Sequence, residues 1–144
     1  MRWATREGIH VDRAASAWLI DRYVDTEAEF VYVQDPADVP ADATAFDIIG
    51  CDLSHHGNDV TFETILRRYD LLDPVLWRIA QIVHQADVED DLYDAPEASG
   101  FDVIIRALGV DHNDEQVRAI ASTMLDSLYR YLHRETLGRP HPAG

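Results

Sequence analysis

Five stretches of the chain carry apolar residues at the three- and four-residue spacing that predicts amphipathic helices. Polar residues suited to helix N-caps stand at their starts: Asp12, Thr61, Asp73, Ser99, and then Asn113 or Asp114. The third helix has Pro74 at its first position, where proline is favoured. The fourth, starting near Phe101, should end at Gly109.

The last helix has the longest apolar stripe, which predicts that it packs in the core, with pairing of two chains as the alternative. The stripe consists of Val117, Ile120, Ala121, Met124, Leu125, Leu128 and Leu132.

Short alternating runs predict a small sheet. Glu29–Val33 is the clearest strand, and Arg2–Thr5 and Phe46–Ile49 are further candidates. We therefore expect an α+β fold, a mainly helical single domain with a small β-sheet of two to four short strands, over residues 1–137. Residues 138–144, rich in glycine and proline, should form a disordered tail.

Composition limits the function classes. With 144 residues, 47% of them hydrophobic, the chain suits one domain with a real core. Its net charge of −15 argues against nucleic-acid binding and favours a surface that attracts cations. The lone Cys51 excludes an intramolecular disulfide and a cysteine-rich zinc module. No signal peptide or membrane-spanning run is visible, so we expect a cytoplasmic protein without membrane contact.

Candidate metal ligands lie in two segments. His84 and Asp87 stand three residues apart on the predicted helix from Pro74, with Asp87 near the centre of its apolar stripe and His84 at the edge. A buried carboxylate needs a hydrogen bond, a cation or a metal. The alternative is structural, with Asp87 capping a following turn and His84 serving as a core histidine.

The segment after the Phe46 strand would supply the third ligand, either His55 or His56, because neighbouring side chains of an extended segment point to opposite faces. Two histidines and one carboxylate with open positions suit iron, manganese or zinc. Further candidate ligands are Asp52, Asp91 and His10, and Asp47 or Asp52 would orient a ligand or water. Arg13, with His10 nearby at a helix start, would bind a small anion.

Several motifs resemble the C-terminal domain of ChrB-type chromate-resistance proteins. The main one runs from His10 to Asp25 and contains Asp12-Arg13 and Trp18-Leu19-Ile20. Others follow in the same order: Phe46-Asp47, Leu53-Ser54-His55, Thr61-Phe62-Glu63, Asp73-Pro74 and Val83-His84-Gln85-Ala86-Asp87. The resemblance spans roughly residues 2 to 130.

This resemblance implies a cytoplasmic protein tied to chromate resistance. The family commonly has Cys-Pro where this chain has Ser16-Ala17, and often a cysteine where it has Val60, which argues against thiol chemistry. Family members carry Arg at the position of His56, which favours His55 as ligand.

Three interpretations remain open. In the first, the site belongs to a metal-dependent enzyme, an oxidoreductase or a hydrolase, in which Arg13 and Asp47 assist the reaction. In the second, the site senses a metal ion or an oxyanion without turnover. In the third, His84 and Asp87 form a buried pair in an interaction module that binds no metal.

Overall fold

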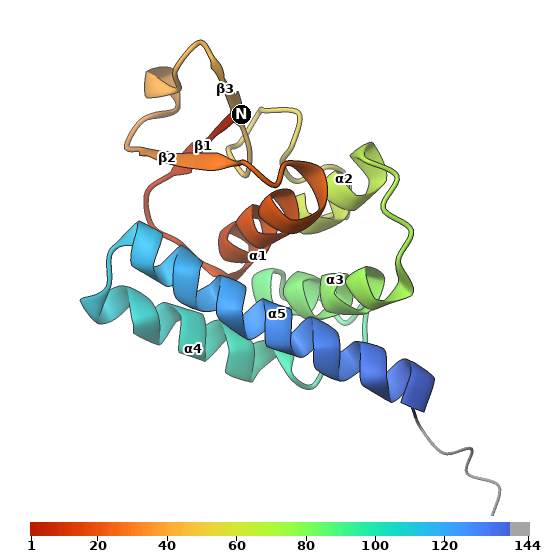
Figure 1. Cartoon of the computed structure of the whole chain (residues 1–144). Coiled ribbons are helices and arrows are strands. Elements are labelled where there is room, and N and C mark those ends of the chain that lie inside the picture. The colour runs from red at the N-terminus through yellow and green to blue at the C-terminus, as the bar shows by residue number, and fades with distance from the viewer. Residues whose placement is uncertain (139–144) are drawn as a thin grey trace, which may run out of the picture.

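The computed structural model describes residues 1–138 and has an α+β fold (Figure 1). Three parallel strands, β1 (Arg2–Arg6), β2 (Glu29–Val33) and β3 (Ala43–Ala45), lie in the order β2-β1-β3. Parallel neighbours need a crossover connection, and the helix α1 (Val11–Leu19) provides it between β1 and β2. A π-helical turn, Ile20–Val24, continues α1.

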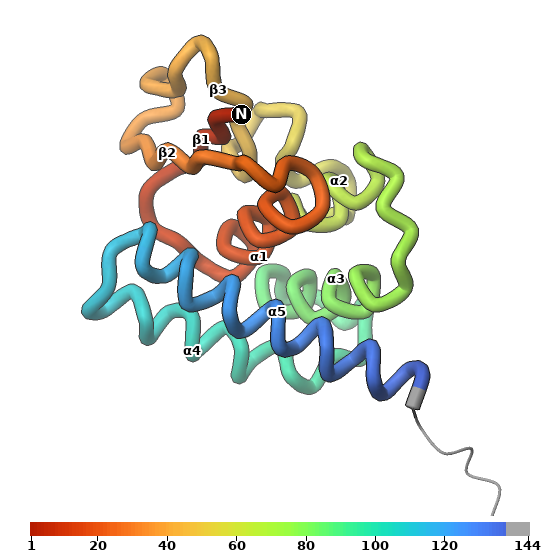
Figure 2. The backbone as a smooth tube through the Cα atoms, viewed as in Figure 1, coloured from red at the N-terminus to blue at the C-terminus, as the bar shows by residue number. Residues whose placement is uncertain are grey.

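Four further helices follow the sheet. They are α2 (Thr61–Arg68), α3 (Pro74–Asp87), α4 (Ala98–Asp111) and α5 (Asp114–Gly138). Figure 2 shows α4 and α5 running antiparallel, side by side, at the end of the molecule farthest from the sheet. No helix within residues 1–138 is long and apolar enough to cross a lipid bilayer.

The core is built around α1, which contacts the four other helices. All nine of its residues are buried, including the polar Asp12, Arg13 and Ser16. Trp18 stacks on Phe62 of α2, and its indole nitrogen donates to Asp126 of α5. A helix this central places its polar side chains inside the molecule, where each needs a partner.

Helix boundaries follow the predicted caps in part. Asp73 accepts from the Val75 amide and α3 begins at Pro74, as predicted. Asn113 and Gln116 bond each other's backbone amides at the start of α5. Six of the seven residues of the α5 stripe pack in or against the core, as predicted, and Ile120 is half-buried.

Other boundaries were predicted wrongly. Asp12 was predicted as an N-cap, but it lies inside α1, and His10 occupies the N-cap position of that helix. Thr61 was also predicted as an N-cap, but it is the first residue of α2, and Val60 occupies the N-cap position. α4 starts at Ala98 and runs two residues past Gly109. The predicted strand Phe46–Ile49 does not form, because the chain turns at Asp47, which has a positive φ of 52°. The predicted disordered tail lies outside the described residues, except for Gly138 at the end of α5.

Candidate metal centre

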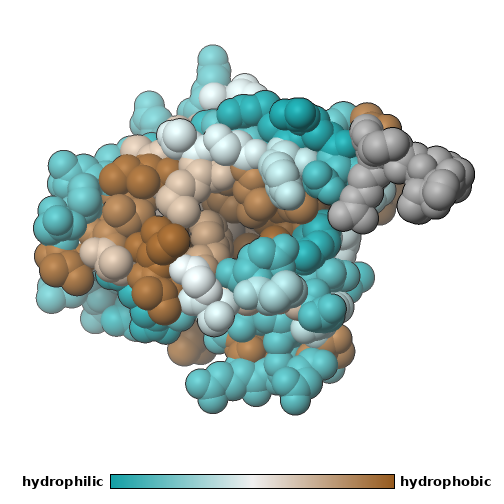
Figure 3. All heavy atoms as spheres, turned by 90° about the horizontal axis from the view of Figure 1, so that it is seen from below, coloured by the Kyte–Doolittle hydropathy of each residue, from teal (hydrophilic) through white to brown (hydrophobic). Residues whose placement is uncertain are grey.

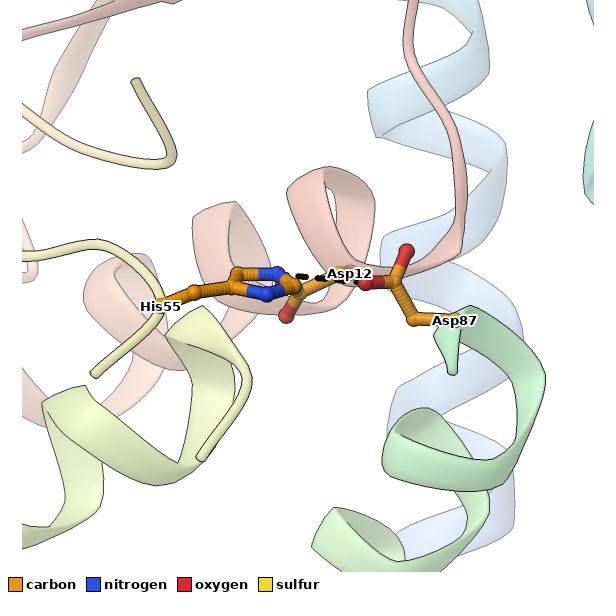
Figure 4. A group of neighbouring side chains, drawn as sticks. All are labelled: Asp12, His55 and Asp87. Carbon is orange, nitrogen blue, oxygen red and sulfur yellow. Dashed lines mark hydrogen bonds and ion pairs between the residues drawn. The ribbon is translucent and has the colours of Figure 1, made fainter. Parts of the chain in front are cut away.

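Three side chains from separate elements converge beside α1 (Figure 4). They are Asp12 in the first turn of α1, His55 in the loop before α2, and Asp87 at the last residue of α3. His55 Nε2 lies 3.0 Å from Asp12 Oδ2 and 3.1 Å from Asp87 Oδ2. One ligand atom from each residue falls within 4.8 Å of the others, a spacing that a single cation can bridge.

Asp12 is held rigidly. Its fully buried carboxylate accepts from the Thr61 amide through Oδ2 and from the Phe62 amide through Oδ1, both at 3.0 Å. These are free amides of the first turn of α2, so Asp12 caps that helix from a neighbouring one. The positive end of the α2 dipole favours this negative charge. The side chain is therefore a fixed anionic anchor.

His55 is the half-exposed member, with 48% of its side chain accessible. The hydrogen bond to Asp12 raises the pKa of His55 to about 9, and the charges of Asp12, Asp87 and Asp47 act in the same direction. Near neutral pH a proton thus holds the position that a metal would take, and a metal ligand must be the neutral imidazole.

Asp87 completes a gathering of negative charge. Its side chain is 19% exposed, and burial, followed by the charge of Asp12, raises its pKa. Burial and Asp12 also raise the pKa of Asp47 to about 7. Neighbouring carboxyl groups raise each other's pKa because their negative charges repel, and a bound cation would stabilise the ionised forms.

A cavity of about 390 Å³ opens beside this group. His55 and Asp87 line it, together with His10, Arg13 and Asp47. The carboxyl of Asp47 accepts from the Thr61 hydroxyl at 2.7 Å through Oδ1, and its Oδ2 lies 3.5 Å from His10 Nε2. Burial, then Arg13, lowers the pKa of His10 to about 4, so this imidazole is neutral at physiological pH.

Arg13 is predicted from sequence to bind an anion, but the structure directs it inward. Its terminal nitrogens donate to the backbone carbonyls of Glu7, Gly8 and Asp47, and its Nε lies 3.0 Å from Asp47 Oδ2. The guanidinium therefore holds the Asp47 turn against α1. Arg13 therefore positions Asp47, which forms part of the cavity wall.

His84 does not join His55 and Asp87. Its ring is fully buried, with Nδ1 2.6 Å from Glu63 Oε1 and Nε2 2.9 Å from Asp90 Oδ2. The helix interpretation placed Asp87 at the centre of the buried face and His84 at its edge, and the structure reverses this order. Both His84 nitrogens already have carboxylate partners. The side chains that the structure brings together are therefore one histidine and two carboxylates, not the predicted two histidines and one carboxylate.

The remaining candidates contribute no atom to the group. Asp52, His56 and Asp91 are exposed, and His56 Nε2 bonds the backbone carbonyl of Asp52. Of the two neighbouring histidines, the structure brings His55 to the site.

Asp12 is the ligand candidate that sequence reasoning missed. It was interpreted as a local cap, yet it shares a helical face with Ala15 and Leu19, both fully buried. A carboxylate in the apolar stripe is the same signal that singled out Asp87, and applied to this helix it would have found Asp12.

Comparison with known proteins identifies relatives. Residues 3–132 match the family described as "ChrB, C-terminal domain". The chain is 37% identical over 132 residues to Protein ChrB of Cupriavidus metallidurans, a match that covers 90% of this chain and 40% of that protein. The chain therefore spans less than half of that relative's length. No solved structure matches it.

Proposed function

Because the chain belongs to the ChrB C-terminal domain family, we propose that it contributes to chromate resistance as a domain that binds a divalent metal ion through Asp12, His55 and Asp87. The observation that carries the proposal is the convergence of three ligand atoms, from three elements, within 4.8 Å beside a cavity. Two carboxylates balance the charge of a divalent cation, and one imidazole with oxygen donors suits manganese, iron or zinc.

The cavity would give a small molecule access to the bound ion. Three protein ligands leave coordination positions for water or a small oxyanion. Asp47 lines the same cavity, and a carboxyl with a pKa of about 7 accepts or donates protons well at neutral pH. With the Arg13 donors directed to the protein itself, attraction of an anion into this acidic cavity would come from the metal.

The test is metal binding by protein purified without a histidine tag. We expect near-stoichiometric binding of manganese, anaerobic iron(II) or zinc in titration calorimetry. His55→Ala and Asp87→Asn should each weaken it by more than about 100-fold, because even the outer partners of metal ligands contribute about 10- to 100-fold.

His56→Ala and Asp52→Asn are matched controls, since they remove the same side-chain types from exposed positions nearby. Both should bind like the wild type, and circular dichroism checks that every variant is folded. A wild-type chain that binds none of the three metals would leave His55 as an imidazolium paired with two carboxylates and would overturn the proposal.

A further inference from the structure

Two regions of the molecule have groups without partners. On the face seen from below in Figure 3, hydrophobic side chains gather over α4, a helix that exposes Val103 and Val110, and nothing in residues 1–138 shows what covers them. The cavity beside Asp12 differs, because buried polar atoms of its lining residues have no hydrogen-bond partner within the same range. The chemistry of those atoms indicates what would bind there.

The cavity lies where the connections of the sheet change direction. From β1 the chain crosses through α1 to β2 on one side, while β3 pairs with β1 on the other side. His10 follows the end of β1, and Asp47 follows the end of β3, so both lie beyond the carboxyl ends of these parallel strands. In open parallel sheets this position is the general place for a bound ligand.

His10 has an unused nitrogen at this cavity. It occupies the N-cap position of α1, but its side chain makes no capping hydrogen bond. Its Nδ1 is buried, has no hydrogen-bond partner within residues 1–138, and lies 3.7 Å from Asp87 Oδ1. That separation is too long for a hydrogen bond. One metal ion at about 2.1 Å from each of the two atoms would bridge it.

The opposite edge of the His10 ring faces Asp47. His10 Nε2 lies 3.5 Å from Asp47 Oδ2, an oxygen that forms an ion pair with Arg13 but accepts no hydrogen bond within the described chain. A neutral imidazole has one N–H group and one lone pair. A hydrogen on Nε2, directed at Asp47, leaves the lone pair of Nδ1 facing Asp87. Histidines that bind metal ions commonly have this arrangement, in which the second nitrogen donates to a carboxylate.

Asp87 has one oxygen for each of two ions. Its Oδ2 lies 3.1 Å from His55 Nε2, in the group with Asp12 that would hold the first ion, while its Oδ1 faces His10. His10 is not a member of that group, so its Nδ1 would serve a different ion. Two-metal sites hold their ions about 3.5–4 Å apart, a distance that the two oxygens of one carboxylate can span.

Charge makes the second site the weaker one. One divalent ion and the Arg13 guanidinium together balance the ionised carboxylates of Asp12, Asp47 and Asp87 when the histidines are neutral. A second ion therefore adds positive charge, which a hydroxide or a small oxyanion in the cavity would neutralise. The net charge of −15 attracts the ion from solution.

We propose that the cavity holds a second divalent metal ion, bound by His10 Nδ1 and Asp87 Oδ1, with Asp87 bridging it to the first ion. This inference rests on the proposed function, because Asp87 serves both ions. Two protein ligands leave the remaining coordination positions to water, and since carboxylate and water ligands suit manganese, manganese(II) is the probe.

The test counts manganese ions bound per chain by equilibrium dialysis at about 0.15 M salt, which screens weak surface binding. We expect two ions per wild-type chain, the second bound more weakly, and an electron paramagnetic resonance spectrum of two coupled neighbours. His10→Ala should bind one ion with unchanged affinity and lose the coupled spectrum. Asp47→Asn should weaken the second ion by about 10- to 100-fold, because it removes the charge that His10 Nε2 faces.

His56→Ala is the matched control, since it removes an exposed imidazole and should still bind two ions. Circular dichroism checks that every variant is folded.

The outcomes distinguish this inference from the proposed function. A wild-type chain that binds one ion, as tightly as His10→Ala does, would overturn the second site and leave the first; a chain that binds none would overturn both. A single ion that His10→Ala weakens would make His10 a fourth ligand of the first site and would overturn the second. A second ion that persists in His10→Ala would be held by other carboxylates and would overturn it as well.

Discussion

At the scale of single residues, His84 and His55 lie in different environments: His84 is part of a buried hydrogen-bond network, and His55 lies at the cavity. His84 is buried between Glu63 and Asp90, and its pKa is raised because these two hydrogen bonds outweigh the lowering effect of burial. The Tyr93 hydroxyl also donates to Glu63, so His84 belongs to a network that joins α2, α3 and the loop after it. His55 lines the cavity, and its Nε2 lies 3.0 Å from Asp12 Oδ2 and 3.1 Å from Asp87 Oδ2.

Substituting each histidine should therefore give opposite results. His84→Gln should lower the free energy of unfolding by about 1–3 kcal/mol, because it disturbs buried hydrogen bonds, and should leave metal affinity near the wild-type value. His55→Gln should remove metal binding, and above about pH 9, where the native imidazole is neutral and its charge no longer stabilises the fold, it should cost little stability. Urea unfolding and metal titration of both variants check this. Loss of metal binding in a folded His84→Gln would return His84 to the ligand set.

The raised pKa of His55 predicts competition between a proton and the metal. Between the unperturbed value of 6.5 and about 9, the folded chain without metal carries this proton, and the metal must displace it. The apparent affinity should rise roughly tenfold per pH unit up to about pH 9. Calorimetry in buffers of different ionisation enthalpy should detect the released proton at pH 7.5. Affinity that is flat with pH would show that His55 is not displaced.

At the scale of elements, the N-terminus of α2 depends on side chains from elsewhere. Val60 occupies its N-cap position, and a valine side chain accepts no hydrogen bond. Glu63 accepts from the Val60 amide, while Asp12 of α1 accepts from Thr61 and Phe62. The start of α2 is thus specified jointly by Glu63 of the helix itself and by the tertiary contact with Asp12.

Asp12→Ala should consequently destabilise the chain even with a chelator present. We expect the free energy of unfolding to fall by about 1–3 kcal/mol, since two buried amides lose their acceptor. Asp52→Ala, at an exposed site, should change it by less than about 0.5 kcal/mol. Urea unfolding of both variants in EDTA measures the difference, and equal stability would mean that water replaces the carboxylate.

This dependence explains which elements the sequence predicts. α3 and α5 carry their start signals locally, in Asp73-Pro74 and in Asn113, and both were predicted correctly. The Phe46 strand failed because Asp47 is fixed in a left-handed turn by Arg13 and Thr61, partners that are distant in sequence. Spacing alone does not contain such contacts.

The candidate site was predictable to a similar degree. His55 and Asp87 were singled out from sequence, and the structure brings them together. His84 was added because it is near Asp87 in sequence, although its side chain points to a different neighbour, Glu63. A helical wheel gives the angle of a residue on its own helix but not which helix packs against that angle.

At the scale of the whole molecule, the dominant quantity is the net charge of −15. Charge of one sign repels itself in the compact state, and salt screens that repulsion. Raising sodium chloride from about 0.01 to 0.15 M should raise the thermal midpoint by a few degrees. If the effect is screening, potassium fluoride at the same ionic strength should raise the thermal midpoint by the same amount as sodium chloride. A midpoint that falls with salt would show that the surface ion pairs outweigh the repulsion.

The carboxylate of Asp12 has one more consequence, which concerns the survival of the protein in the cell. Because Asp12 caps α2 as well as facing His55, an unfolded chain cannot bring the three candidate ligands together. An ion that binds the folded chain alone adds to stability according to its free concentration. Proteases act on the unfolded fraction, so the supply of metal would set how much of this protein a cell retains. Its abundance would then report metal availability without any change in its synthesis.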